Sequence, residues 1–263
     1  MQKKTFLQES LRNGRIIRWA DNCMPLKIYI APFRFYSKQG EDYKYNNMVL
    51  RAFETWQRVS GGKISFEIVT SLLHSQINLS WKRVDRQALG HCYFNFDMHN
   101  RVYSAEMQIG ISDGLIHKEY TEEGEVYHTI LHEIGHALGL GHSPNENDIM
   151  YSPHRYGVVN LSKGDEFSLR WLYKFQPNTT VPEIAAKYGI PSTNLDEIVD
   201  KLIQKNIPSD FEKVKNSLRT PQRDLLLEQE NIADLKKYNI ALQNIKISEN
   251  IRTMFINQPS NRK

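Results

Sequence analysis

The sequence predicts an α+β fold in which a mixed domain of strands and helices is followed by a smaller helical region. Three observations predict it. Short runs with alternating apolar residues, typical of strands, recur between residues 25 and 111. Stretches with apolar residues at i, i+3 and i+4, typical of amphipathic helices, interrupt and follow them. After a turn-rich stretch at 176–182, the chain is rich in charged residues and poor in aromatic ones.

The order of the elements can be read along the chain. Predicted strands are 25–31, 63–69, 75–81, 89–94 and 102–111. Predicted helices of the main domain cover 45–59, about 125–138 and a stretch that begins near Ser162. The spacing from Ser162 to Asp165 is that of a capping box, with aspartate in place of the preferred glutamate.

Three parts are expected: a polar N-terminal leader at 1–20, the main domain at 21–176, and a helical C-terminal extension at 177–263. Candidate helices of the extension are 182–188, 193–205, 209–218 and roughly 221–246. The apolar stripe of the last helix could pack on the main domain, on a neighbouring helix or on a partner.

Composition and charge exclude several classes of function. The chain has 263 residues and a net charge of +4 without a concentrated basic stripe, so nucleic acid is not an expected partner. No run approaches the roughly 18 apolar residues that a membrane-spanning helix needs. The N-terminal MQKK is followed by no apolar stretch, so no cleavable signal peptide is predicted. The two cysteines, Cys23 and Cys92, could form one bridge or stay as thiols.

The stretch HEIGHALGLGHS, which begins at His132, has the spacing of a metal site. His132 and His136 are four residues apart, which on a helix places both imidazoles on one face. Gly139 permits the positive-φ turn that ends a helix, and Gly141 adds freedom, so that His142 can approach the same ion. Three protein ligands with one position left for water are typical of a catalytic zinc site. One catalytic Zn²⁺ is therefore predicted.

Glu133 follows the first of these histidines and would lie beside a zinc-bound water. Zinc lowers the pKa of water from about 16 towards about 7, and Glu133 would then remove the proton as general base. This chemistry predicts a zinc-dependent metalloendopeptidase, a hydrolase that cleaves internal peptide bonds of proteins or peptides. Two alternatives share the motif: a non-catalytic zinc-containing module that binds peptides, and a zinc amidohydrolase of a non-protein substrate.

The pattern HExxHxxGxxH, followed by Met150, resembles the metzincin clan of zinc metallopeptidases. Ser143, directly after the third histidine, is similar to the matrixin subgroup, the relatives of the matrix metalloproteinases. The runs at 51–69 and 161–173 also resemble matrixin catalytic domains, so the resemblance spans about residues 16–174. It implies a twisted, mostly parallel five-stranded sheet with an antiparallel edge strand, three helices, and an extracellular location.

The resemblance also implies roles for residues outside the histidine motif. Met150 would form a tight turn beneath the metal without binding it. Tyr151 and the loop through Tyr156 would form a wall of the specificity pocket. The strand with Gly90 and His91 would form an upper rim that pairs with an extended substrate. These positions favour cleavage inside a chain over trimming of its ends.

The chain departs from the matrixin pattern at three points. The ligand pattern of a second, structural zinc is missing apart from His91. The calcium ligands of the family are not recognisable, and Asp97 with its neighbouring asparagines is better interpreted as part of a solvated loop. The residues around Cys23 differ from those that flank the metal-blocking cysteine of matrixin precursors. A single zinc ion is therefore the expected metal.

Overall fold

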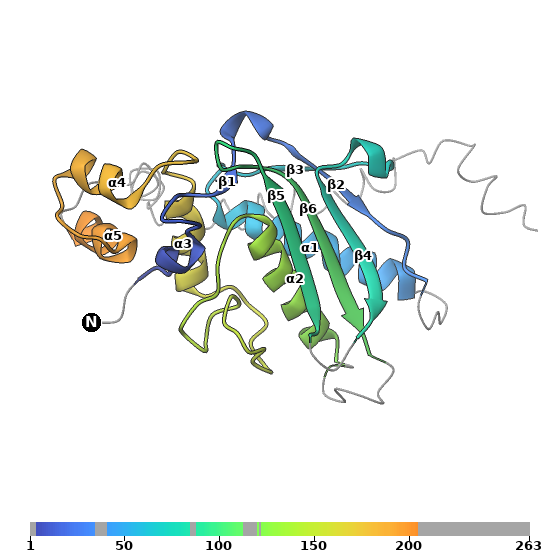
Figure 1. Cartoon of the computed structure of the whole chain (residues 1–263). Coiled ribbons are helices and arrows are strands. Elements are labelled where there is room, and N and C mark those ends of the chain that lie inside the picture. The colour runs from blue at the N-terminus through green and yellow to red at the C-terminus, as the bar shows by residue number, and fades with distance from the viewer. Residues whose placement is uncertain (1–3, 35–40, 85–87, 113–119, 121, 205–263) are drawn as a thin grey trace, which may run out of the picture. The chain divides into compact units, whose positions relative to one another are not determined.

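The computed structural model describes residues 4–34, 41–84, 88–112, 120 and 122–204. Within them, one six-stranded sheet runs in the order β1-β6-β4-β2-β3, with β5 paired to β6 (Figure 1). All neighbouring pairs are parallel except β5 with β6. The α+β class and the antiparallel edge strand are confirmed, and β1 is one strand more than the expected five. The strands are β1 (Arg18–Trp19), β2 (Leu26–Ile30), β3 (Phe66–Ile68), β4 (Ile77–Arg83), β5 (Gly90–Phe96) and β6 (Arg101–Ile111).

Strand β5 lies at an edge of the sheet. Val102 of β6 pairs with Phe96 of β5 and with Trp19 of β1, so β1 and β5 lie along opposite sides of β6. No other described strand runs along the second side of β5. An edge of this kind offers backbone N–H and C=O groups with which an extended peptide can pair.

Two long helices, α1 (Glu41–Val59) and α2 (Glu123–Ala137), pack against each other on one face of the sheet (Figure 1). A third helix, α3 (Lys163–Leu172), begins at the predicted capping box. The side chain of Ser162 accepts a hydrogen bond from Asp165 N, and the side chain of Asp165 accepts one from Ser162 N. These reciprocal bonds satisfy backbone donors that a helix start otherwise leaves unpaired.

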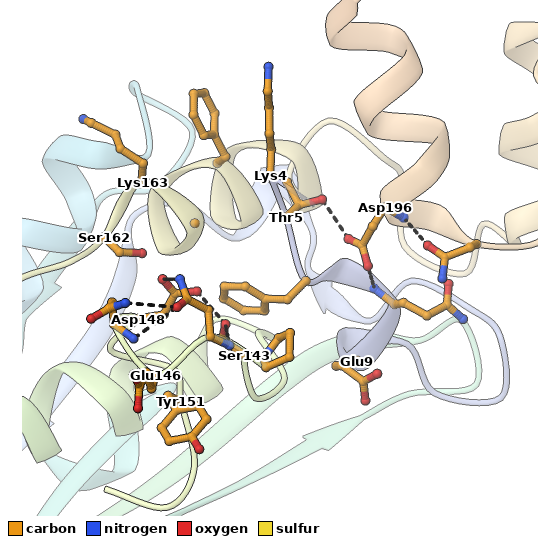
Figure 2. A pocket seen from close by; sticks show the side chains of 18 residues that line it. Lys4, Thr5, Glu9, Ser143, Glu146, Asp148, Tyr151, Ser162, Lys163 and Asp196 are labelled. Carbon is orange, nitrogen blue, oxygen red and sulfur yellow. Dashed lines mark hydrogen bonds between the residues drawn. The ribbon is translucent and has the colours of Figure 1, made fainter. Parts of the chain in front are cut away.

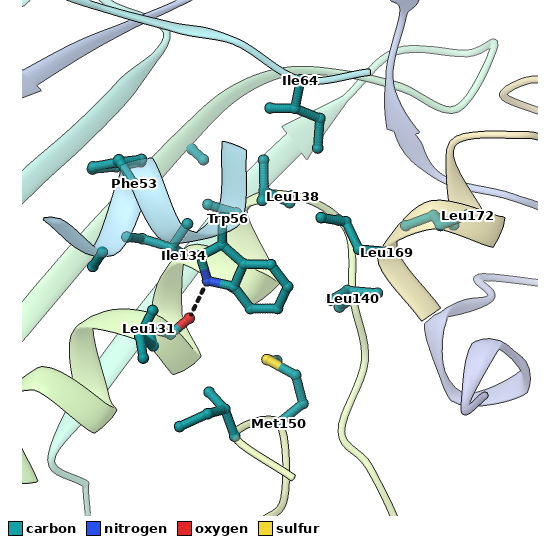
Figure 3. Close-up of a cluster of buried hydrophobic side chains, with 14 of the residues drawn as sticks. Phe53, Trp56, Ile64, Leu131, Ile134, Leu138, Leu140, Met150, Leu169 and Leu172 are labelled. Atoms are coloured by element: carbon teal, nitrogen blue, oxygen red, sulfur yellow. Dashed lines mark hydrogen bonds between the residues drawn. The ribbon is translucent and has the colours of Figure 1, made fainter. Parts of the chain in front are cut away.

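Trp56 of α1 lies at the centre of the core between the helices (Figure 3). Its indole Nε1 donates to the carbonyl oxygen of Leu131 in α2, at 2.9 Å. Gly135 allows Met150 and Trp56 to approach α2, because a Cβ at Gly135 would collide with the Met150 sulfur and lie 3.2 Å from Trp56 Cζ2. The helix that carries the histidine motif is thereby fastened to α1 directly beside the motif.

The described part of the predicted polar leader, residues 4–20, contributes apolar side chains to the core, so it is not the polar leader that the sequence predicts. Trp19 is buried, and its indole Nε1 donates to the carbonyl oxygen of Ala137 at 2.8 Å. The apolar side chains of this segment follow neither a helical nor a strand period, so no local pattern reveals their burial. The other buried apolar side chains there are Phe6, Leu7, Ile16 and Ile17.

Helices α4 (Val181–Tyr188) and α5 (Leu195–Gln204) confirm the predictions at 182–188 and 193–205. Both belong to the same compact unit as the sheet, Met1–Ile207, so the structure does not divide at the expected boundary after residue 176. The helices predicted at 209–218 and 221–246 lie outside the described residues. Within the described ranges, no helix has the length and apolar character that a bilayer crossing requires.

Replacing Trp56 by phenylalanine should lower the free energy of unfolding by about 2 kcal/mol, because it removes a buried hydrogen bond and leaves a gap between the helices. Urea unfolding followed by circular dichroism measures this change. Tyr103→Phe, at an exposed aromatic side chain, is the control and should keep the wild-type midpoint. Equal midpoints for Trp56→Phe and the wild type would contradict the role given to this side chain.

Candidate metal centre

Helix α2 presents His132 and His136 one turn apart, as their spacing predicts. Gly139 follows the helix with φ of +98°, a left-handed conformation that favours glycine. A Cβ at Gly139 would also lie 2.7 Å from the carbonyl oxygen of Ile17. The chain reverses here and brings His142 back to the other two imidazoles.

Glycine is needed at position 141 for a reason other than the conformational freedom that the sequence suggests. Its φ is not among the positive values of the described residues. A side chain at Gly141 would collide with the carbonyl oxygen of Glu9, and the Gly141 N–H donates to Ser10 Oγ at 2.9 Å. Close approach of the N-terminal segment therefore accounts for this glycine, and conformational freedom does not.

The three histidines converge on one point. Nε2 of His136 lies 3.1 Å from Nε2 of His132 and 3.2 Å from Nε2 of His142. Tetrahedral zinc with nitrogen ligands at about 2.0–2.1 Å separates two of them by roughly 3.3 Å, so the spacing fits this ion. Nδ1 of His132 lies 2.7 Å from the carbonyl oxygen of Ile149, and Nδ1 of His136 lies 2.8 Å from that of Leu140. With both Nδ1–H groups donating, the Nε2 lone pairs are left for a metal.

Burial keeps these imidazoles neutral. It lowers the pKa of His136 to about 4 and holds the pKa of His132 well below its ordinary value. The pKa of the more exposed His142 is also lowered, first by burial and then by the charge of Arg12. Neutral imidazole is the form that binds a metal ion, so these pKa shifts suit ligation at neutral pH.

Glu133 lies beside the histidines and is 5% exposed. Burial raises its pKa to about 8, against an opposing effect of Lys82. A dication at the histidines would favour the charged carboxylate and lower this pKa again. Gly90 of β5 faces Glu133, since a Cβ there would lie 2.6 Å from Glu133 Oε1 and 2.7 Å from Thr129 Cγ2. Gly90 therefore leaves the room that the carboxylate occupies.

A cleft of about 480 Å³ connects these groups. Strand β5 contributes Gly90 and His91 to one wall, and the loop 151–156 contributes Tyr151 and Tyr156 to the other. The four residues that the sequence predicts as substrate-binding thus lie around one cavity, together with the histidines and Glu133.

A buried carboxylate ties the loop 151–156 to α2. Oε2 of Glu125 lies 2.8 Å from His154 Nε2, and Oε1 accepts a hydrogen bond from Gly157 N at 2.9 Å. The ring centroids of His154 and His128 lie 4.1 Å apart. Nδ1 of His128 contacts the carbonyl oxygen of Val158. Burial lowers the pKa of His128 to about 4. Sequence reasoning missed Glu125 and His154 because they are distant in the chain and form no motif.

Met150 is buried and lies against Gly135 of α2. The turn that carries it is held by Asp165, a fully buried carboxylate of α3. Asp165 accepts hydrogen bonds from the backbone N–H groups of Ile149 at 2.9 Å and Met150 at 3.2 Å. The capping-box spacing identified Asp165 at the sequence level, but only as the start of a helix.

Two other expectations concern the cysteines and Asp97. Cys23 and Cys92 are both free thiols. The carboxylate of Asp97 accepts hydrogen bonds from His99 N at 2.8 Å and from Arg101 Nε at 2.7 Å, and the Arg101 guanidinium lowers the pKa of Asp97 to about 2. Asp97 therefore closes the turn between β5 and β6, as its interpretation as a loop residue suggests.

Comparison with known proteins finds similar sequences that are named as metalloproteinases. Metalloendoproteinase 1 of Glycine max is 29% identical over 149 residues, which are 52% of this chain and 48% of that protein. Metalloendoproteinase 2-MMP of Arabidopsis thaliana is 27% identical over 193 residues, 65% of this chain and 47% of that protein. A putative matrix metalloproteinase of Trichoplusia ni ascovirus 2c is 26% identical over 154 residues, 50% and 30% of the two chains. The chain spans less than half the length of these curated relatives.

The pattern of the family Peptidase_M10, described as Matrixin, matches residues 30–174. This stretch is more than half of the chain and contains the three converging histidines, Glu133 and the turn at Met150. The chain belongs to the matrixin family.

Proposed function

We propose that this protein is a zinc-dependent metalloendopeptidase that hydrolyses internal peptide bonds of proteins. The convergence of three neutral imidazole nitrogens beside the buried carboxylate of Glu133 carries the proposal. Membership of the matrixin family and the names of the similar proteins support it. His132, His136 and His142 would hold the ion, and Met150 would support the site from below without binding it.

When bound, zinc supplies Lewis-acid chemistry by lowering the pKa of water to about 7 and by polarising a carbonyl group. Glu133 accepts the proton of the attacking water at a carboxylate oxygen while the new C–O bond forms. The same carboxylate then gives the proton to the nitrogen of the leaving amine as the C–N bond breaks. One carboxylate serves both proton transfers, so a side-chain nucleophile is not needed.

The substrate is proposed to bind as an extended peptide along β5. The second side of β5 faces the cleft with no described strand along it, so its backbone groups can pair with a peptide. Gly90 and His91 lie on this strand, and Tyr151 and Tyr156 lie across the cleft to receive a side chain. Pairing along a strand does not need a chain terminus, which favours internal cleavage.

Substituting glutamine for Glu133 should lower kcat/KM by about a hundredfold or more, because the amide cannot accept the proton. Cleavage of a peptide library, followed by mass spectrometry with and without a zinc chelator, measures this loss. Zinc content should stay at the wild-type value, since the substitution removes no ligand. Glu67→Gln, on exposed β3, is the matched control.

The same experiment separates the alternatives. Peptides captured intact by the wild-type protein would indicate a binding module, and inactivity on all peptides with turnover of small amides would indicate an amidohydrolase. Full activity in Glu133→Gln would refute the proposed mechanism.

Placing alanine at Gly90 should reduce kcat by about a hundredfold, because the added methyl displaces the Glu133 carboxylate and catalytic groups misplaced by about 1 Å lose that much activity. Zinc affinity should change little, since Gly90 faces the carboxylate and not the histidines. Gly124→Ala, at the start of α2 and not among the residues that line the cleft, provides the control. Wild-type turnover by Gly90→Ala would show that the cleft does not need this space.

A further inference from the structure

The loop that carries His142 rests on the N-terminal segment, defined here as residues 4–10. Ser10 Oγ accepts a hydrogen bond from Gly141 N at 2.9 Å; the Ser10 side chain is buried and the bond is partly buried. The carbonyl oxygen of Glu9 occupies the space that a Gly141 side chain would need. Because Gly141 directly precedes His142, the N-terminal segment fixes the backbone position from which the His142 side chain extends.

The N-terminal segment is in turn held by α5. Oδ1 of Asp196 accepts a hydrogen bond from Thr5 Oγ1 at 2.7 Å (Figure 2). Oδ1 also accepts one from Leu7 N at 2.6 Å, and Oδ2 accepts one from Gln8 N at 3.2 Å. Leu195 N donates back to Gln8 Oε1 at 2.9 Å. Asp196 is 3% exposed, so its carboxylate is a buried anchor whose charge is matched by hydrogen-bond donors of the segment.

A cavity of about 870 Å³ separates α5 from the loop that follows His142. Asp196 lines one side of this cavity, and Ser143 and Asp148 line the other (Figure 2). The N-terminal segment runs along the cavity between them and packs on both α5 and α3. It is therefore the physical connection from α5 to the histidine loop.

The two parts that support the histidine loop, the N-terminal segment and Asp196, both lie outside residues 30–174, the stretch that matches the matrixin family. The N-terminal segment precedes that stretch and Asp196 follows it. The support of the third histidine thus comes from parts of the chain that the family pattern does not describe.

We propose that Asp196 is a positioning residue of the metal site, which through residues 4–10 holds Gly141 and thereby His142 where the three imidazoles converge. The proposal rests on the proposed zinc site. Loss of the Asp196 carboxylate leaves the buried donors of Thr5 and Leu7 unpaired, so the segment must shift to find other partners. Gly141 N then loses its hydrogen bond to Ser10 Oγ, and the backbone position of His142 is no longer fixed.

The test uses the full chain with the substitution Asp196→Ala. Groups that orient metal ligands change metal affinity by about tenfold to a hundredfold when removed, so zinc affinity should fall by about tenfold. Competition with a chromophoric chelator measures this affinity. In the metal-free protein, hydrogen exchange at the amides of 139–142 should become faster, because the Gly141 N–H bond to Ser10 is loosened.

Two further variants test the route. Ser10→Ala should weaken zinc binding to a similar extent. The double variant with Asp196→Ala should bind zinc no more weakly than either single variant, since both remove the same support. Asp196→Asn keeps one acceptor oxygen and should fall between the wild type and Asp196→Ala. If Asp196→Ala does not fold, Asp196→Asn and Ser10→Ala decide the question.

Two controls on α5 separate positioning from general loss of stability. Asp200→Asn changes a neighbouring carboxylate, which within the described residues accepts an exposed hydrogen bond from Lys4 N at 3.3 Å, and should bind zinc as the wild type does. Val199→Ala destabilises the same helix from a buried position but leaves the Asp196 bonds in place. It should lower the unfolding midpoint without changing zinc affinity.

The outcomes are distinguishable. A folded Asp196→Ala protein with wild-type exchange at 139–142 and wild-type zinc affinity overturns the proposal, as does a Val199→Ala protein with the same loss of affinity. If the wild-type protein binds zinc but cleaves no peptide, the proposed function fails and the positioning role is still decided. If it binds no zinc, the hydrogen exchange of the metal-free variants decides whether Asp196 holds the loop.

Discussion

The site depends on holding three imidazole lone pairs at one point. Nitrogen atoms 3.1 to 3.2 Å apart repel each other unless a proton or a cation lies between them. Burial disfavours the protonated form of all three histidines, so a metal ion is the partner that best relieves this repulsion. The backbone carbonyl groups of Ile149 and Leu140 hold two of the rings in the required tautomer. The remaining architecture can be understood as the support of this arrangement.

Close approach of other groups to glycines supplies much of that support. At four glycines the space of a side chain is taken by another part of the chain: by Glu133 at Gly90, by the Met150 sulfur at Gly135, and by carbonyl oxygens of the N-terminal region at Gly139 and Gly141. Protein interiors are close-packed, so displacement of one of these segments is felt by its neighbour. The site is therefore shared between the sheet, α2, the turn beneath it and the N-terminal region.

Buried carboxylates fasten the loops around the cleft. Glu125 holds the loop with His154 and Gly157, Asp165 holds the turn at Met150, and Asp196 holds the N-terminal segment. A buried carboxylate is costly unless hydrogen-bond donors replace water. For Asp165 the burial still outweighs its donors and raises its pKa to about 6. Each of these buried carboxylates favours one loop conformation, because other conformations would leave it without hydrogen-bond donors at a high cost in free energy.

The sequence by itself determined those features that depend on residues a few positions apart. The spacing of His132 and His136, the helix that carries them and the cap at Ser162 follow from the geometry of a single helix. Five of the six described strands, all except β1, were predicted to within a few residues because alternation marks a sheet with one buried face.

Only the tertiary structure decided which distant groups meet. It placed Gly90 against Glu133, buried the N-terminal segment, and joined Thr5 to Asp196 across a sequence separation of 191 residues. Such contacts are set by how elements pack, and a hydrogen bond between distant segments leaves no period or spacing in the sequence. The chemistry of the site was thus visible in one short motif, whereas the support that holds its third histidine was visible only after folding.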